Sequence, residues 1–280
     1  MRDGFAYDGL SIQGVCSYYQ LSRQAYYQSV KSIQKKALET EKVLMLVKER
    51  RKLLPREGCR KLCVSLAGGF REMGLKIGRD QLFDILREEQ MLVYPRKKYA
   101  VTTNSNHPFR IYNNLIDKLV PTSINQIWVT DITYIRMNKG FCYLALITDT
   151  YSRKIVGYDI SDSLELQGCK RALKMALKSL PAQHRLIHHS DRGSQYCSGE
   201  YTKLLKDRNI RISMAAKGNC YENALAERVN GILKNEFYLD LTFYSKQQAI
   251  KSCKHAIQLY NEVRLHLGID LLTPSMKHAA

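Results

Sequence analysis

The chain has 280 residues, of which 45% are hydrophobic, and it carries 44 Lys and Arg side chains against 26 Asp and Glu, a formal net charge of +18. This length and composition support a buried core and exclude an intrinsically disordered chain. The positive surplus favours polyanion partners, because neutralising phosphates releases counterions. A merely soluble or ribosome-associated basic protein is the alternative.

Targeting and redox signals are absent from the sequence. No apolar run approaches the roughly 18 residues that a membrane helix needs, and no leader pattern opens the chain, so we expect a cytoplasmic, nucleoid-associated protein. The eight cysteines are scattered, without a CxxC pair or a His partner at zinc-finger spacing. We therefore expect reduced thiols and no zinc site.

The N-terminal third is predicted to be helical. Residues 1–54 begin with a helix, a short turn and a second helix capped by Ser22, which is a helix-turn-helix shape, and a basic amphipathic helix follows over 37–53. Residues 55–93 form a second helix-turn-helix-like unit. For either unit, a structural packing of helices without DNA contact is an equally good interpretation. Residues 94–120 are rich in Pro, Asn and Lys and are predicted to be a basic linker.

The region 121–242 alternates strands and helices and is predicted to be an α/β domain, followed by a C-terminal helical tail over 243–280. Three strands form an antiparallel meander, and helices then separate two further strands, so a mixed β-sheet flanked by helices is expected. The predicted strands are 128–135, 141–148, 154–160, 185–189 and 210–214. The predicted helices are 163–180, 199–208, 221–239 and 245–260.

Three carboxylates in this region are candidates for chemistry. Asp131 lies within the first strand, Asp191 follows the fourth strand, and Glu227 lies on the long helix, with 59 and 35 residues between successive acids. Carboxylates can hold two divalent cations, which clamp the attacking and leaving oxygens of a phosphoryl transfer. For Asp131 taken alone, a salt bridge to an Arg side chain is the preferred alternative.

Other polar residues near these acids are weaker candidates for the site. His188 and His189 alternate sides of a strand, so we expect one core histidine and one residue that supports the site, not a zinc pair. Asp149 is expected to be a turn and capping residue. Glu222 belongs to a helix start and Glu236 lies off the polar stripe of the long helix. That stripe consists of Asn223, Glu227, Asn230 and Lys234, and Lys234 is either a phosphate contact or a solvated surface lysine.

Four segments carry a family resemblance: WVTDITYI, LITDTYSRKIVGY, HHSDRGSQY and KGNCYENALAERVNGILKNE. They resemble the signature blocks of integrase-core (RNase H-like) DDE transposases, and more narrowly the second-frame (OrfB) protein of a large bacterial insertion-sequence group. The segments GCRKLCVSLAGGF and YNEVRLHLGIDLLTPSMK extend the resemblance toward both ends of the chain. The sequence departs from the family pattern at Ala215-Ala216, Glu222, Arg228-Val229-Asn230 and Leu265, and these departures leave the three acids in place.

The resemblance implies an RNase H-like fold in which Asp131, Asp191 and Glu227 bind two Mg²⁺ ions, with Mn²⁺ as a substitute. It implies cleavage at terminal inverted repeats of double-stranded DNA, where a metal-activated water frees a 3′-hydroxyl that attacks a second phosphodiester without a covalent protein intermediate. It also implies a first-frame companion protein and a homo-oligomer on DNA, for which we identify no heptad repeat. We expect the DNA-binding residues to be Lys234, Asn223, Arg192, Lys217, Arg23 and Arg79.

Two other functions stay open. The first is a catalytically inactive relative that binds DNA as a repressor or as the partner of an active copy. The second is a ribonuclease acting on RNA–DNA hybrids, which shares the fold but leaves the two N-terminal helical units without a purpose, and we rank it last.

Overall fold

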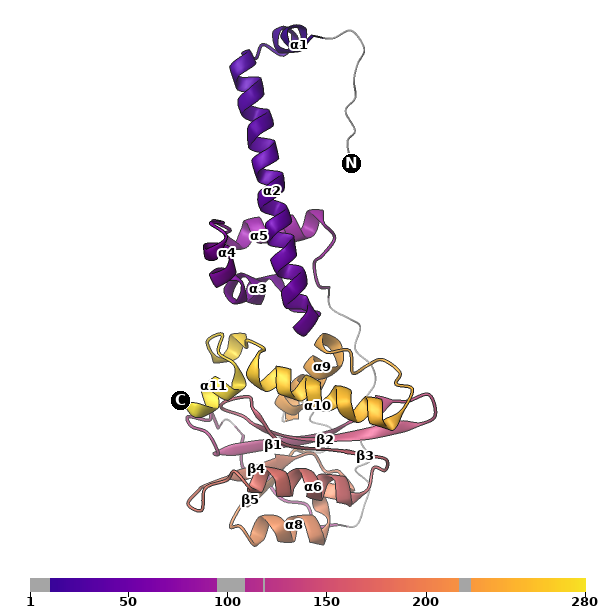
Figure 1. Ribbon diagram of the computed structural model, residues 1–280. Coiled ribbons are helices and arrows are strands. Elements are labelled where there is room, and N and C mark those ends of the chain that lie inside the picture. The colour runs from indigo at the N-terminus through magenta and orange to yellow at the C-terminus, as the bar shows by residue number, and fades with distance from the viewer. Residues whose placement is uncertain (1–10, 95–108, 118, 217–222) are drawn as a thin grey trace. The chain divides into compact units, whose positions relative to one another are not determined.

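The computed structural model describes residues 11–94, 109–117, 119–216 and 223–280, and the chain divides into two compact units (Figure 1). The helical unit is made of the described parts of residues 1–52 and 62–92. The sheet unit is made of the described parts of residues 53–61 and 93–280. None of the helices within these ranges is both long and apolar enough to cross a membrane.

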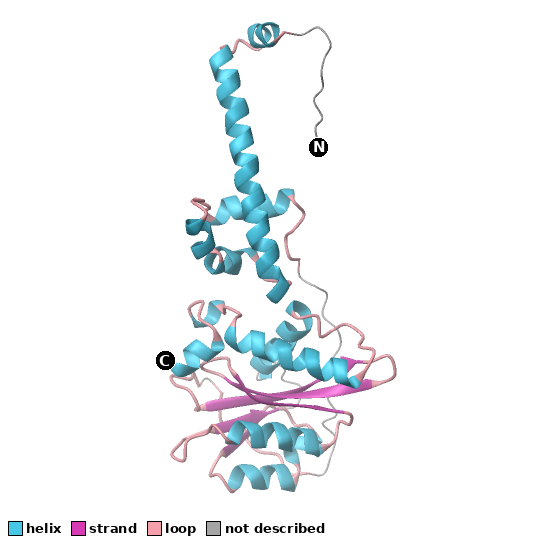
Figure 2. Cartoon of the chain, in the orientation of Figure 1, coloured by secondary structure: helices cyan, strands magenta, loops and turns pink. Residues whose placement is uncertain are grey.

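The helical unit packs short helices around the C-terminal half of one long helix (Figure 2). Val43 and Val47 of the long helix are fully buried, as are Leu62, Leu82 and Leu86 of the shorter ones. These apolar residues form the core that stabilises the unit. Its helices are α1 (Ile12–Tyr18), α2 (Arg23–Leu53), α4 (Ala67–Glu72), α5 (Arg79–Glu88) and the part of α3 (Cys59–Ser65) from Leu62 onward.

The start of α2 is as predicted, but its length is not. The Ser22 hydroxyl accepts a hydrogen bond from the Ala25 amide at 3.0 Å, which confirms the predicted cap. The helix then continues to Leu53, so the predicted separate helix over 37–53 is its C-terminal half. No Gly or Pro interrupts this stretch, and nothing in its sequence ends the helix earlier. The predicted subdivision into 1–54 and 55–93 stays a prediction.

The sheet unit contains a five-stranded mixed sheet in the order β3-β2-β1-β4-β5, which confirms the predicted α/β fold class. The first three strands pair antiparallel as a meander, whereas β4 and β5 join the other side of β1 in parallel. β1 therefore lies at the centre. The strands are β1 (Ile127–Arg136), β2 (Phe141–Asp149), β3 (Ile155–Ser161), β4 (Ile187–Ser190) and β5 (Arg211–Met214).

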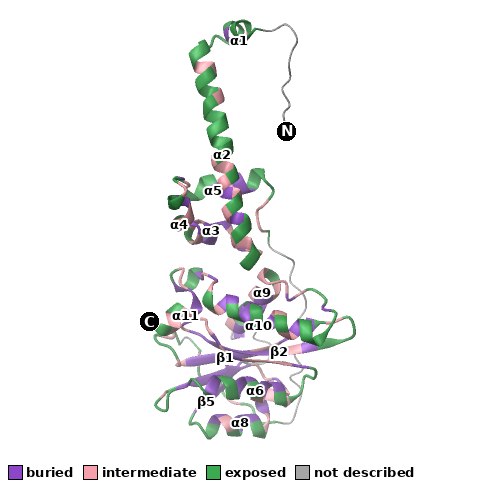
Figure 3. Cartoon of the chain, in the orientation of Figure 1, coloured by how far each residue is buried: buried purple, intermediate pink, exposed green. Residues whose placement is uncertain are grey.

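Helices cover both faces of this sheet, and each face has its own core (Figures 1 and 3). Trp128 packs with Leu173 and Leu205 on the face of α6 and α8. Ile135 packs with Leu233 and Ile257 on the face of α9 and α10. The even and odd residues of β1 thus serve opposite cores, as strand alternation requires. The helices of this unit are α6 (Leu166–Leu177), α7 (Ser194–Cys197), α8 (Gly199–Lys206), α9 (Ala224–Glu236), α10 (Lys246–Glu262) and α11 (Pro274–Ala279), with a 3₁₀ turn at Leu267–Ile269.

Helix α6 lies unusually close to the sheet at Gly157. A Cβ atom at this position would lie 2.3 Å from the Ala172 carbonyl oxygen and 2.9 Å from the Ala176 Cβ. Only glycine allows the strand and the helix to approach this closely.

The helix predicted over 163–180 is shorter in the structure, where α6 spans Leu166–Leu177.

The predicted linker falls largely outside the described residues, since 95–108 and 118 are not among them. Residues 109–117 contain no helix or strand. The Leu115 amide donates a hydrogen bond to the Ser213 hydroxyl at 2.8 Å, which ties this stretch to β5. The final part of the linker thus belongs to the sheet unit.

Candidate active site

Two of the three predicted acids meet on neighbouring strands. β1 and β4 are parallel, and their register pairs Val129 with His189. Continuing this register by two residues places Asp191, directly after β4, beside Asp131 on β1. Adjacent strands lie about 4.8 Å apart, so the two carboxylates share one edge region of the sheet. The fold therefore brings together two acids that are far apart in the sequence.

Both oxygens of the Asp131 carboxylate accept hydrogen bonds. Oδ1 accepts one from the Ile132 amide at 2.8 Å, and Oδ2 accepts one from the Asn230 side-chain amide at 2.8 Å. Burial, followed by the negative charge of Asp191, raises the pKa of Asp131 to about 7, and Glu227 adds to this shift. The two hydrogen bonds oppose the rise. Asp131 is thus an acid whose ionised form is held in an unfavourable, negatively charged environment.

Asp191 lies at the start of the loop after β4. Its Oδ1 accepts a hydrogen bond from the Gly193 amide at 3.0 Å. A Cβ atom on Gly193 would lie 3.1 Å from this same Oδ1 and 3.1 Å from Gln195 Oε1. Gly193 therefore lets the backbone approach the carboxylate closely and fix its orientation. This is the edge of the sheet at which ligand sites of open α/β folds gather.

Glu227 lies in the first turn of α9 and is exposed. Its charge reaches Asp131, since it contributes to the raised pKa of that acid. Among the described residues, however, no three His, Cys, Asp or Glu side chains are close enough together to hold a metal ion. The three side chains therefore have to come closer together than they are in the structure to share a cation.

Two asparagines of α9 face β1 and were not predicted to position an acid. Asn230 holds Asp131, as described above, and Asn223 at the N-cap of α9 donates to the Thr130 carbonyl oxygen at 3.3 Å. Both side chains are buried, and neither Oδ1 atom has a hydrogen-bond partner within the described part of the chain. The sequence signal was their spacing in the polar stripe with Glu227. The stripe was identified, but the role of Asn230 toward Asp131 was not.

Lys234 continues the same stripe and is half-buried. Burial lowers the pKa of Lys234, and the charges of Asp131 and Asp240 oppose this shift. Its ammonium group is therefore close enough to Asp131 to interact with it. The interpretation as a fully solvated surface lysine is not what the structure shows.

The other predicted DNA-binding residues lie in different places. Arg192 is next to Asp191, and its Nε donates to the Ala215 carbonyl oxygen at 2.8 Å. Lys217 lies outside the described residues. Arg23 and Arg79 belong to the helical unit, at the first positions of α2 and α5, and both are exposed. Arg79 pairs with Asp80 at 2.8 Å.

The remaining polar candidates have structural partners. His188 Nε2 lies 3.0 Å from the Tyr201 hydroxyl, and burial lowers the pKa of His188 to about 3, so it is a neutral core residue. His189 Nδ1 lies 2.9 Å from Ser213 Oγ. Glu236 forms a two-pronged ion pair with Arg264, with N–O distances of 2.6 and 2.8 Å.

Asp149 caps the turn between β2 and β3. One of its oxygens accepts hydrogen bonds from the amide and the hydroxyl of Ser152, both at 2.8 Å, and the other accepts from the Asn125 amide at 2.8 Å. The residue is fully buried. It therefore has the turn-stabilising contacts that the sequence predicts for it.

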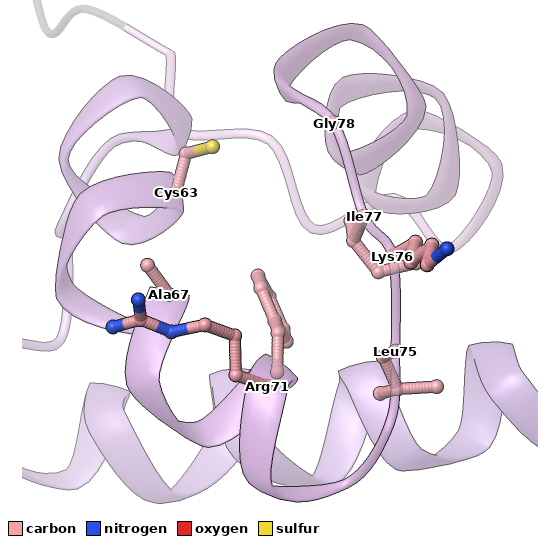
Figure 4. A pocket seen from close by; sticks show the side chains of 8 residues that line it. Cys63, Ala67, Arg71, Leu75, Lys76, Ile77 and Gly78 are labelled. Carbon is pink, nitrogen blue, oxygen red and sulfur yellow. The ribbon is translucent and has the colours of Figure 1, made fainter.

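A separate hollow of about 580 Å³ lies in the helical unit, and none of the three acids contributes to it (Figure 4). Arg71 and Lys76 border it, together with the apolar side chains of Phe70 and Ile77. The three carboxylates, by contrast, belong to the sheet unit.

Comparisons with known proteins agree with this arrangement. Residues 121–220 match a family model described as integrase core domain, and residues 208–274 match a second model of the same description. The uncharacterized 31 kDa protein of insertion element IS600 from Shigella sonnei is 35% identical over 265 residues, which are 93% of this chain and 96% of that protein. The transposase InsF of insertion sequence IS3A from Escherichia coli strain K12 is 34% identical over 191 residues, which are 68% of this chain and 66% of the transposase.

Solved structures also resemble the chain, at lower identity. The catalytic core domain of HTLV-2 integrase, in complex with magnesium, is 21% identical, covers 56% of this chain and 98% of its own, and has a TM-score of 0.46. A simian T-cell lymphotropic virus intasome chain is 18% identical, covers 81% of this chain and 72% of its own, and has a TM-score of 0.48. The two sequence relatives are the more informative matches.

Proposed function

Because the chain belongs to the integrase-core DDE transposases of bacterial insertion sequences, a class of polynucleotidyl transferases, we propose that it cuts double-stranded DNA at terminal inverted repeats and joins the ends to a target. We assign Asp131, Asp191 and Glu227 as the catalytic carboxylates. The observation that supports this assignment is the parallel register of β1 and β4, which directs Asp191 toward Asp131, together with the charges of Asp191 and Glu227 that raise the pKa of Asp131.

The donor set fits a hard divalent cation, Mg²⁺ or Mn²⁺, because such ions take carboxylate oxygens as ligands. Two bound ions would stabilise the charge that develops on the attacking and leaving oxygens of the phosphodiester. A cation would also offset the burial and the repulsion by Asp191 that raise the pKa of Asp131 to about 7. Asp131, Asp191 and Glu227 would together hold the ions once their side chains come closer than in the described structure.

The basic residues hold the DNA backbone. Lys234 and Arg192 would contact phosphates next to the scissile bond, and Lys217 is a further candidate for such a contact. Asn223 is not, because its side chain is buried and donates to the Thr130 carbonyl oxygen. Arg23 and Arg79, at helix starts of the helical unit, would contact duplex DNA. We propose a first-frame companion protein and a second copy of the chain as the other partners of the complex.

Substitution of the acids tests the proposal. Asp131→Asn, Asp191→Asn and Glu227→Gln each remove a negative charge with little change of shape, so each variant should lose Mg²⁺-dependent cleavage of labelled inverted-repeat DNA and keep its DNA binding. Glu200→Gln, at an exposed carboxylate on α8, is the matched control and should cleave normally. The reactions are run with and without the companion protein. Unchanged cleavage by any of the three variants contradicts the assignment.

The same assay separates the other functions. An inactive DNA-binding relative would retain DNA and never cut it with either metal, even in the presence of the companion protein. A hybrid-specific ribonuclease would cut a labelled RNA–DNA duplex in preference to inverted-repeat DNA. The labelled RNA–DNA duplex is therefore included beside the inverted-repeat DNA.

A further inference from the structure

Three charged side chains of the sheet unit meet largely away from solvent, at the opposite end of α9 from Glu227. The Glu236 carboxylate lies between Arg264 and Lys61. Arg264 Nη2 and Nε donate to its two oxygens at 2.6 and 2.8 Å, and Lys61 Nζ lies 3.1 Å from Oε2. Arg264 is 7% exposed and Lys61 8%. We call Lys61, Glu236 and Arg264 the buried triad, and the reaction proposed above uses none of them.

The buried triad joins the end of α9 to two other segments of the chain. Glu236 is the last residue of α9, Arg264 follows α10, and Lys61 lies in the first turn of α3. Arg264 is itself held in place. Its guanidinium carbon lies 6.0 Å from the centre of the Tyr260 ring, and the buried Tyr260 hydroxyl donates to the Arg153 carbonyl oxygen at 3.0 Å. The group that binds Glu236 is therefore part of the packed core.

A buried ion group adds little net stability, but it restricts geometry. Taking charges out of water costs about as much free energy as their attraction returns, so apolar side chains of the same volume would stabilise the fold equally well. The two-pronged contact of a guanidinium with a carboxylate, in contrast, has only one good geometry. Burial would raise the pKa of Glu236, but the hydrogen bonds and charges of Arg264 and Lys61 outweigh it and lower this pKa. The carboxylate therefore stays ionised and held.

Glu236 and Glu227 belong to the same helix, so a constraint on one affects the other. They are nine residues apart, which is about two and a half turns, and they project from opposite sides of α9. A rotation of the helix by about 20° about its axis would move a side-chain tip by about 2 Å. A displacement of only about 1 Å can cost a catalytic group two orders of magnitude in rate. The rotation of α9 therefore matters for Glu227.

We propose that Arg264 and Lys61 are positioning residues for Glu227. Through Glu236 they set the rotation of α9, and this rotation sets the distance of Glu227 from the two aspartates. The inference rests on the function proposed above, which assigns Glu227 as a catalytic carboxylate. Because both cations are buried, they do not contact DNA phosphates. Their loss therefore lowers turnover and leaves the affinity for DNA unchanged.

Arg264→Lys tests this role, because it keeps the charge and removes the two-pronged contact. With labelled inverted-repeat DNA and Mg²⁺, kcat should fall about tenfold, while KM for DNA stays within about twofold. Gly157→Ala is the control for lost stability, because it disturbs β3 and α6 and should keep kcat. Lys61→Met should also lower kcat. Lys61→Arg, which retains a cation beside Glu236, should keep it.

Two measurements without catalysis locate the effect. In the presence of a chelator, amide hydrogen exchange in α9 should be faster in Arg264→Lys than in Gly157→Ala, after correction of each for its loss of global stability. Mn²⁺ titration of the DNA-free protein should give a dissociation constant that is about tenfold higher for Arg264→Lys and unchanged for Gly157→Ala.

The outcomes separate this inference from the proposed function. Equal losses of kcat in Arg264→Lys and Gly157→Ala overturn the positioning role, as does a wild-type Mn²⁺ dissociation constant in Arg264→Lys. If Asp131→Asn loses cleavage but Arg264→Lys cuts at the wild-type rate, the assignment of the acids stands and the inference fails. If the wild type does not cut DNA, the proposed function fails, and the Mn²⁺ titration still tests whether Arg264 positions the acids.

Discussion

The side-chain amide of Asn230 on α9 donates a 2.8 Å hydrogen bond to Oδ2 of Asp131 on β1. The other end of this amide, Oδ1, is buried without a hydrogen-bond partner in the described part of the chain. A buried polar atom of this kind costs about 1–3 kcal/mol, which a leucine of similar shape would avoid. Asn230 therefore holds the Asp131 carboxylate in place, while the burial of its Oδ1 lowers the free energy of unfolding of the protein.

Asn230→Leu should separate stability from activity. The variant removes the orphaned Oδ1 but also leaves Asp131 Oδ2 without its donor, and these opposing effects are each about 1–3 kcal/mol, so the free energy of unfolding should stay within about 1 kcal/mol of wild type. Loss of the bond to Asp131 should lower Mg²⁺-dependent cleavage by about 10- to 100-fold, which is typical for residues that orient a metal ligand. Denaturant unfolding and the cleavage assay measure the two effects. Asn235→Leu, at an exposed asparagine on the same helix, should change neither.

Stability should fall as pH rises through the range in which Asp131 ionises. The pKa of Asp131 is about 7 in the folded protein against an ordinary value of 3.8, so between these values the folded state holds a proton that the unfolded state has lost. The folded state is then favoured at the acidic end, and its advantage disappears by about pH 7, with a total change of at most about 4 kcal/mol.

Denaturant unfolding in the presence of a chelator, at a series of pH values, measures this effect. Asp131→Asn should flatten the pH dependence and be more stable than wild type above pH 7. Asp117→Asn, at an exposed aspartate of the same unit, should retain the wild-type profile. Saturating Mn²⁺ should stabilise the wild type, by about 2.7 kcal/mol at 100 times the dissociation constant, but not the Asp131→Asn variant. If Asp131→Asn and wild type have the same pH profile, ionisation of Asp131 is not the cause of the pH dependence of stability.

Gly157→Ala should destabilise the sheet unit. The new methyl group would lie 2.3 Å from the Ala172 carbonyl oxygen, so α6 has to move away from β3. We expect a loss of about 1–3 kcal/mol or more in the free energy of unfolding, as for other overpacked cores. Gly231→Ala on α9 is the control, since nothing lies within 4 Å of its new Cβ. It should gain up to about 1 kcal/mol from helix propensity.

Lys234→Gln should weaken DNA binding uniformly across sequences. If Lys234 neutralises one phosphate, its loss should reduce the slope of log affinity against log salt concentration by about one. Fluorescence anisotropy with a labelled duplex at several salt concentrations gives this slope. Lys251→Gln, at an exposed position of α10, should leave it unchanged. An unchanged slope for Lys234→Gln would show that Lys234 does not neutralise a DNA phosphate.

Much of the sheet unit could be predicted from the sequence, because its strands alternate regularly and its helices have distinct ends. The strand that carries Asp131 and the polar stripe that carries Glu227 both follow from local periodicity. The proximity of Asp131 and Asp191 does not, since it depends on the pairing of two strands with fifty residues between them. The bond from Asn230 to Asp131 depends in the same way on how α9 packs against β1.

The errors in the helical unit have a different physical origin. A separate helix was expected to begin at residue 37, yet the stretch from Arg23 to Leu53 has no glycine or proline to end a helix and forms the single helix α2. Helix continuity is set by the absence of breakers, which is harder to recognise than a cap such as Ser22.

The parallel pairing of β1 with β4, from Ile127–Ile187 to Val129–His189, brings Asp131 and the loop residue Asp191 into the same part of the sheet. Glu227, in contrast, lies on α9, and side-chain hydrogen bonds from Asn223 and Asn230 join this helix and its N-cap to β1. A tilt of α9 would therefore change the distance of Glu227 from the two aspartates without changing the register of β1 and β4.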